Sequence, residues 1–178
     1  MPLRPNALSW LLVSVGVIVL DQLTKAWVEA SFALASPSAP AGSATAPTPV
    51  VGDLVRVART WNDGGVFGLF GDSATILGLA SIAVIGVILW VEATSGVRSP
   101  LLTVALGLLF GGAIGNLIDR LRFGHVIDWV DTGIGSLRFY TFNVADAAIS
   151  IALVLLIMLT IFGTRLTRDS SHAPQAAS

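Results

Sequence analysis

The sequence predicts an all-α membrane protein of four transmembrane helices, with a small extramembrane β-sheet and loop region on one face. The composition is the first observation behind this prediction: of the 178 residues, 54% are hydrophobic and 12% are charged, about half the charged fraction of a typical soluble domain. So few charges could not cover a soluble surface, in keeping with the mean hydropathy of +0.81. Four apolar runs are the second observation, since each approaches the ~20 residues that a helix needs to cross a bilayer. A chain of this length forms a single domain, 1–178.

The four predicted spans differ little in length. They cover residues of about 8–28, 74–93, 101–118 and 144–162. A cleaved secretory signal is the alternative for the first run, but Asp21 and Lys25 interrupt its apolar core and no small-residue cleavage site follows closely. We therefore expect the first run to be a retained helix.

The connections between the spans are unequal in length. A short turn joins the second span to the third, whereas residues 31–72 and 119–142 form two longer loops. With four spans, both longer loops fall on one side of the membrane and both termini on the other. Almost all polar chemistry is therefore expected on one face.

The longer loops contain two kinds of sequence. Residues 35–49 hold four of the eight prolines, and such a segment is expected to be a mobile insertion because it buries too little apolar surface to offset its ordering entropy. Residues 50–61 are β-branched and 138–142 are aromatic, so these two stretches predict the small sheet. The chain ends in a polar tail, 165–178.

The distribution of positive charge gives an ambiguous orientation. The side of the termini carries Arg4, Arg98, Arg165 and Arg168. The side of the longer loops carries Lys25, Arg56, Arg59, Arg120, Arg122 and Arg138. This count by itself favours cytoplasmic longer loops, but we discount it because several of these residues are site candidates rather than topology signals.

The composition excludes several kinds of chemistry. The chain contains no cysteine, which rules out disulfides, thiol nucleophiles and thiolate metal sites. His125 and His172 are its two histidines, so a serine triad or a histidine-rich metal site is hard to assemble. The net charge of −1 offers no basic surface for nucleic acid. We expect neither a metal nor a cofactor.

Charged and amide side chains at membrane depth cost several kcal/mol and so require explanation. In the first span, Asp21 and Lys25 are spaced i, i+4 and can pair; the pair is either functional or a self-neutralising pair whose lysine extends to the interface. Gly112, Asn116 and Arg120 share one face of the third span. The glycine there suits close helix packing, whereas the amide and guanidinium suit backbone carbonyls or an anionic head group.

Three further polar positions lie around the longer loops. Asn62 precedes a glycine-rich stretch, WNDGGVFGLFG, which alone predicts only a turn before the second span. Asp128 lies in GHVIDWVD. Asn143 and Asp146, in FNVADAA, open the fourth span, where they also resemble a capping box.

Asp128 and Asp146 together can supply acid and base chemistry without histidine, thiol or metal. A loop that folds back would place both carboxylates at one helix mouth, where they cannot both ionise easily. One then acts as general base for water and the other as general acid for the leaving amine. The dipole of the fourth helix favours an ionised Asp146, which leaves Asp128 as the proton carrier.

Five motifs in order resemble those of the lipoprotein signal peptidases, also called signal peptidase II, aspartyl proteases of family A8. They are DQLTK, N-x-G-G-x-F, GGAIGN-x-x-DR, GHVIDW and FNVADAAI. The resemblance implies that Asp128 and Asp146 are the catalytic dyad. It assigns pocket or supporting roles to Asn62, Gly112, Asn116, Arg120 and Asn143, and structural support to Asp21 and Lys25. Asp119 belongs to the DR pair but does not match the catalytic carboxylates of the family.

The resemblance also implies a substrate and a location. The substrate would be a bacterial prolipoprotein that carries diacylglycerol on its lipobox cysteine and is cut just before that cysteine. Both termini would lie in the cytoplasm and the site near the outer face of the inner membrane, and the cyclic peptide globomycin would be an inhibitor. Membrane lipids and the prolipoprotein would be the partners of a monomeric enzyme. The proline-rich segment 35–49 is the main departure from the family pattern.

Two other functions compete with a protease. A transporter or channel would use the intramembrane polar residues as an ion path, but the second span is almost wholly apolar and the polar clusters lie at helix ends. A membrane scaffold would use the same residues for capping, packing and interface contacts. The scaffold function predicts that Asp128 and Asp146 can be replaced by asparagine without loss of function. The protease function predicts that they cannot.

Overall fold

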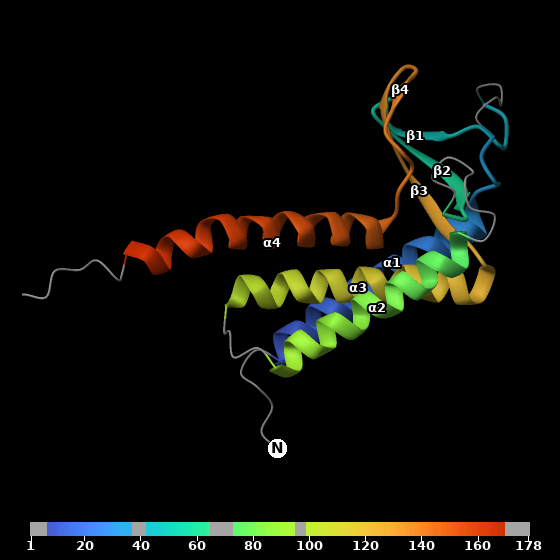
Figure 1. Ribbon diagram of the computed structural model, residues 1–178. Coiled ribbons are helices and arrows are strands. Elements are labelled where there is room, and N and C mark those ends of the chain that lie inside the picture. Colours follow the sequence, from blue (N-terminus) through green and yellow to red (C-terminus); the bar gives the residue numbers. More distant parts are fainter. Residues whose placement is uncertain (1–6, 37–41, 65–72, 95–98, 170–178) are drawn as a thin grey trace, which may run out of the picture.

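The computed structural model describes residues 7–36, 42–64, 73–94 and 99–169. In order, its elements are α1 (Ala7–Ser31), β1 (Thr48–Val51), β2 (Val55–Asn62), α2 (Ser73–Thr94), α3 (Pro100–Phe123), β3 (Val126–Ile134), β4 (Leu137–Arg138) and α4 (Val144–Asp169). All four helices are long and apolar enough to cross a membrane, so the predicted fold class is confirmed. Figure 1 shows the strands gathered at one end of the helices, where α4 begins.

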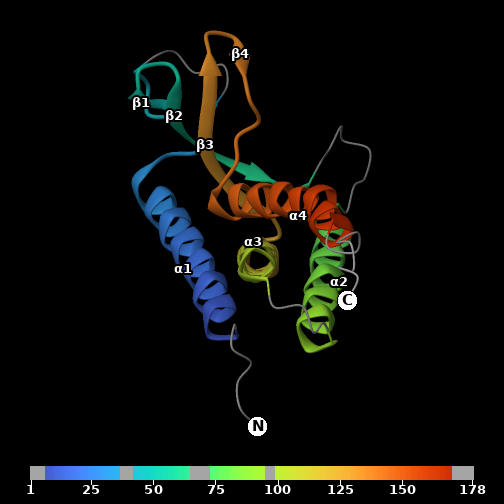
Figure 2. The ribbon, with the colours of Figure 1, turned by 90° about the vertical axis from the view of Figure 1, so that its left-hand side faces the viewer.

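The helix α3 is the centre of the bundle. It packs against α1, α2 and α4, and in Figure 2 it is seen end-on between them. Half of its membrane-spanning window is buried inside the protein, against 11 to 17% for the other three helices. The outer helices therefore present their apolar side chains to lipid, while α3 presents its own to its neighbours.

Glycines on α3 permit this close packing. A Cβ at Gly111 would lie 2.8 Å from the carbonyl oxygen of Ser14, and one at Gly112 would lie 2.6 Å from that of Ala145. Each distance is too short for a real Cβ atom, so the backbones of α1 and α4 can approach α3 only where it lacks side chains.

The end of α3 lies further along the chain than the sequence predicted. The predicted span stopped near residue 118, whereas the helix continues to Phe123 and ends at Gly124, whose φ of 76° is left-handed. The backbone N–H of Gly124 donates to the carbonyl of Arg120, as in a glycine-terminated helix. Asp119 and Arg120 therefore lie on the last turns of a helix and not in a loop.

The sheet is antiparallel, with strand order β1-β2-β3-β4. The prediction that it would consist of residues 50–61 and 138–142 was only partly right, because β2 pairs with β3 and not with 138–142. Of the latter stretch, Arg138 lies in β4 and Phe142 makes an isolated bridge with Val130. The sequence of β3, VIDWVDTGI, is rich in β-branched residues and tryptophan, which favour a half-buried strand.

The described part of the proline-rich segment is attached to this sheet. The N–H of Ala35 donates to the carbonyl of Arg59, and that of Ser36 donates to the carbonyl of Thr45. Thr48 and Pro49 already belong to β1. Residues 37–41 lie outside the described residues, and so do 65–71 of the glycine-rich motif, so the mobility of the insertion stays a prediction.

Candidate active site

Asp128 and Asp146 come from different elements and share one neighbour. Asp128 lies on β3 with 2% of its surface exposed, and Asp146 lies in the first turn of α4. The side-chain amide of Asn143 donates to Oδ1 of Asp128 at 2.7 Å, and its oxygen accepts from the backbone N–H of Asp146 at 2.9 Å. The sequence prediction that a loop returns the two carboxylates to one helix mouth agrees with this link.

The capping box at the start of α4 is also present. Oδ2 of Asp146 accepts from the backbone N–H of Asn143 at 3.2 Å, while Asn143 caps Asp146 in return. Because the capping residue also contacts Asp128, capping and catalysis are not exclusive readings here. The cap fixes the orientation of the Asp146 carboxylate relative to Asp128.

Two more asparagines complete the hydrogen bonds of the pair. The amide of Asn116 on α3 donates to Oδ1 of Asp146 at 2.7 Å. Asn62, the last residue of β2, donates to Oδ2 of Asp128 at 2.9 Å. Each carboxylate is therefore held on both oxygens, and neither can rotate freely.

The environment of Asp128 favours its protonated form. Burial, above all, and the charge of Asp146 raise the pKa of Asp128 to about 6, because a buried carboxylate near a like charge is costly to ionise. The hydrogen bonds from Asn62 and Asn143 and the charge of Lys25 act in the opposite direction. Asp128, which the sequence predicts to be the proton carrier, is thus the carboxylate whose pKa is raised.

The ammonium group of Lys25 contacts three oxygen atoms next to the site, one for each of its protons. Its Nζ lies 2.8 Å from Oδ2 of Asp21, 2.8 Å from Oδ2 of Asp119 and 3.0 Å from Oδ1 of Asn116. Only 2% of the lysine side chain is exposed. The predicted i, i+4 pair is present, but the lysine is buried in the bundle and does not extend to the interface.

Both acidic partners of Lys25 also accept hydrogen bonds from other residues. Oδ1 of Asp21 accepts from the backbone N–H of Ala145 at 3.0 Å, so α1 caps α4. Oδ2 of Asp119 accepts from the N–H of Ile127 at 3.2 Å, one residue before Asp128, and its Oδ1 accepts from Gln22 at 2.9 Å.

Asp119 and Gln22 were therefore missing from the predicted site residues. Asp119 lies three positions after Asn116 on α3, and Gln22 is next to Asp21. This spacing is the signal that could have found Asp119.

Arg120 and Gly112 lie near the pair without a hydrogen bond to it. Arg120 interacts electrostatically with Asp146 and Asp128, and its Nη1 makes only a long bond, 3.4 Å, to the carbonyl of Asn116. Gly112 acts by having no side chain, since this lets the backbone of α4 approach α3 at Ala145. The structure thus links seven of the predicted side chains by hydrogen bonds or ion pairs, places Arg120 beside them and gives Gly112 a packing role.

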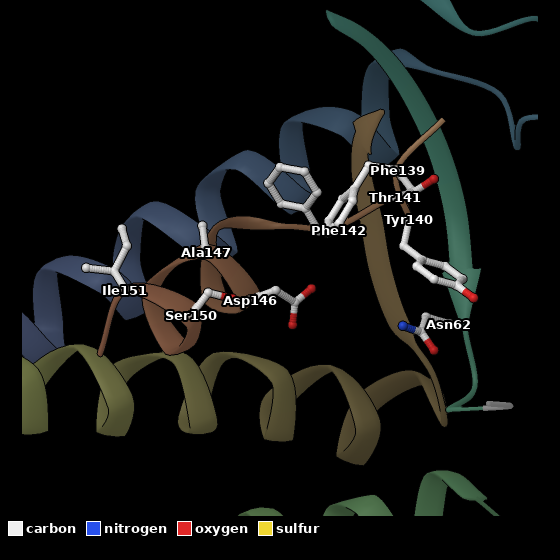
Figure 3. A pocket seen from close by; sticks show the side chains of 9 residues that line it. All are labelled: Asn62, Phe139, Tyr140, Thr141, Phe142, Asp146, Ala147, Ser150 and Ile151. Atoms are coloured by element: carbon white, nitrogen blue, oxygen red, sulfur yellow. The ribbon is translucent and has the colours of Figure 1, made fainter. Parts of the chain in front are cut away.

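A cavity of about 560 Å³ opens beside Asp146. Its wall consists of aromatic, hydroxyl and small side chains from three segments, namely Asn62, Phe139, Tyr140, Thr141, Phe142, Asp146, Ala147, Ser150 and Ile151. Figure 3 shows Asp146 and Asn62 facing the same space, below the aromatic residues. Among the described residues, no three histidine, cysteine or acidic side chains gather as metal ligands.

A four-helix membrane fold with two linked carboxylates at a helix mouth is that of a membrane-embedded aspartic endopeptidase, and comparisons with known proteins agree. The family model described as Signal peptidase (SPase) II matches residues 13–162. The chain therefore belongs to the signal peptidase II family, that of the lipoprotein signal peptidases, and is a multi-pass membrane aspartic endopeptidase. Membership in this family sets aside the transporter and the scaffold.

Relatives from distant bacteria support the assignment over most of the chain. The chain is 33% identical to the lipoprotein signal peptidase of Xylella fastidiosa strain M12, over 98% of this chain and 97% of the relative. It is 31% identical to that of Staphylococcus carnosus, over 87% of this chain and 91% of the relative.

Solved structures are similar as well. A bacterial membrane enzyme determined in meso at 2.3 Å has a TM-score of 0.73 and 25% identity, covering 96% of this chain and 94% of that one. A second, at 1.9 Å, has a TM-score of 0.74 and 26% identity over 85% and 92%.

Proposed function

We propose that this endopeptidase removes signal peptides from diacylglyceryl-modified prolipoproteins, cutting before the lipidated cysteine, with Asp128 and Asp146 as its catalytic pair. The observation that carries the proposal is the Asn143 side chain, which bonds Asp128 through its amide and the N–H of Asp146 through its oxygen. A residue that served only as a helix cap would not need a buried carboxylate on its other side.

The proposed reaction uses one water molecule. Ionised Asp146 takes a proton from water while the water oxygen bonds to the carbonyl carbon before the cysteine. Asp128, whose pKa is raised to about 6, gives its proton to the leaving amine nitrogen as the C–N bond breaks. The products are a signal-peptide carboxylate and a free cysteine amine, and proton exchange with solvent restores the two aspartates.

The other predicted residues would hold this geometry. Asn62, Asn116 and Asn143 orient the carboxylates, and Arg120 supplies positive charge near them. The backbone contact at Gly112 and the bonds of Asp21 and Lys25 fix the start of α4 against α3.

The tryptophans support a site close to one membrane surface. Trp10 and Trp27 lie 17 residues apart on α1, about 26 Å along a helix, near the ~30 Å of a hydrocarbon core. Trp27 contacts Trp129 of β3, with ring centroids 6.2 Å apart, as expected for an interfacial aromatic belt. We propose that this belt marks the outer face of the bacterial inner membrane, with both termini cytoplasmic and the protein a monomer.

The test is cleavage of a diacylglyceryl-modified prolipoprotein by purified protein in detergent. We expect Asp128→Asn and Asp146→Asn each to lower kcat by at least ~10²-fold, the scale of general acid–base catalysis, without loss of folded protein. Asp53→Asn, on the half-exposed turn before β2, is the matched control and should cut normally. Normal cleavage by both dyad variants would make these aspartates structural and the mechanism wrong.

A further inference from the structure

A second cavity lies between α2 and α4. It has a volume of about 410 Å³. Its floor is α3 and its walls are α2 and α4, with lining residues Leu77, Ala80, Ser81, Val84, Leu109, Ala113, Asn116, Arg120, Ile149 and Leu153. Figure 2 shows α4 above α3 and α2 to its right. We call this cavity the lateral groove.

The lateral groove follows α3 and is mostly apolar. Its floor runs along one face of α3 from Leu109 to Arg120, eleven residues or about 16 Å. Leucine, isoleucine, valine and alanine side chains make up most of its lining, which suits the hydrocarbon of a lipid chain.

The polar end of the lateral groove is Arg120. Among the described residues, Arg120 forms no salt bridge, and its Nε is buried without a hydrogen-bond partner. A buried guanidinium donor of this kind is costly unless a ligand satisfies it. Asn116, the neighbouring polar residue of the groove, donates directly to Asp146. An acceptor bound at Arg120 would thus lie beside the proposed catalytic pair.

We propose that the lateral groove binds the acyl chains of the diacylglyceryl group on the substrate cysteine, with Arg120 donating to the glycerol ester carbonyls. This proposal rests on the proposed function. The lipid is attached next to the bond that is cut, so it must leave the site toward the membrane. The cavity beside Asp146, with its aromatic and hydroxyl lining, is then left for the peptide.

The experiment fills the lateral groove and varies the length of the lipid. Ala80→Leu and Ser81→Leu add bulk to the α2 wall, and Ala83→Leu, on the same helix but outside the groove residues, is the matched control. Each purified protein cleaves two synthetic lipopeptides, one with dipalmitoylglyceryl cysteine and one with dibutyrylglyceryl cysteine. Melting temperature in detergent confirms that the variants are folded.

We expect the two groove variants to raise KM for the dipalmitoyl substrate by about tenfold, since displacing two methylenes costs roughly 1.5 kcal/mol. Values for the dibutyryl substrate, and kcat for both, should change less than twofold. Equal effects on the two substrates would mean that the groove holds bilayer lipid or serves helix packing, which overturns the inference alone. Failure of the wild type to cut either lipopeptide would instead overturn the proposed function.

Discussion

Two charge clusters flank the proposed catalytic pair, and they differ in their access to water. The inner cluster, Asp21, Lys25 and Asp119, lies within the helix bundle with 0 to 2% of each side chain exposed. The outer cluster lies on the sheet and consists of Asp53, Arg56, Asp131 and Arg138. There Arg56 is 24% and Asp53 48% exposed, and only Asp131, at 7%, is buried between two arginines.

The comparison shows where ionic contacts control the fold. Desolvated charges are tolerated only as a complete set, because each unpaired member costs several kcal/mol. Charges that keep contact with water can lose a partner and be solvated instead. The inner cluster is therefore a condition for the fold and the outer cluster an addition to it, although both have similar ion-pair distances.

Removing the lysine of the inner cluster is expected to have the largest effect. Lys25→Met keeps the length of the side chain but leaves Asp21 and Asp119 buried without a cation. We expect a loss of about 3–5 kcal/mol in stability, seen as a strongly lowered melting temperature in detergent. The double variant Lys25→Met/Asp119→Asn should recover part of it, and a melting temperature unchanged by Lys25→Met would refute this view of the cluster.

An intermediate effect is expected at Asn62, which links the sheet to Asp128. If Asp128 must be protonated to act, kcat/KM falls as pH rises through its pKa of about 6. The Asn62 hydrogen bond lowers that pKa by stabilising the charged form, so Asn62→Ala should raise it further. The descending limb of the pH profile should then move upward by roughly one pH unit, the worth of a hydrogen bond to a charged group.

The pH experiment has a clear negative outcome. A limb that stays in place, or moves to lower pH, would show that Asp128 is not the group whose protonation limits the reaction. Thr60→Ala, on the same strand and bonded only to the backbone carbonyl of Asp128, serves as the control.

The smallest effect is expected in the outer cluster. Arg56→Met removes one cation, as Lys25→Met does, but Asp131 keeps its contact with Arg138 at 2.9 Å. We expect at most about 1 kcal/mol of destabilisation, and less in high salt because the pair is partly solvated. A loss as large as that of Lys25→Met would remove the distinction between the clusters.

Sequence reasoning was accurate where the signal is local. Composition and apolar run length predicted the four spans, and the i, i+4 spacing predicted the contact of Asp21 with Lys25. The link between Asp128 and Asp146 was predicted from two motifs only 18 residues apart. These features depend on neighbours along the chain or on short returns of it.

It was less accurate where contacts join distant elements. Gln22 and Asp119 are 97 positions apart, so no local spacing predicts their contact, although the position of Asp119 three residues after Asn116 could have pointed to it. The strand β3 was missed because residues 119–142 were taken as a loop, although the β-branched residues and tryptophan of VIDWVDTGI favour a strand. The lateral groove has no sequence signal, since it arises only where side chains of α2, α3 and α4 meet in space.

The hydrogen bond from the N–H of Ala145 to Asp21 has a consequence for biosynthesis. It joins residues 124 positions apart, or roughly 6 to 25 seconds of ribosomal synthesis. During that interval the first helix is already made while the last is not. On the proposed mechanism, the enzyme acquires its activity only when its final helix, which carries Asp146, enters the bilayer.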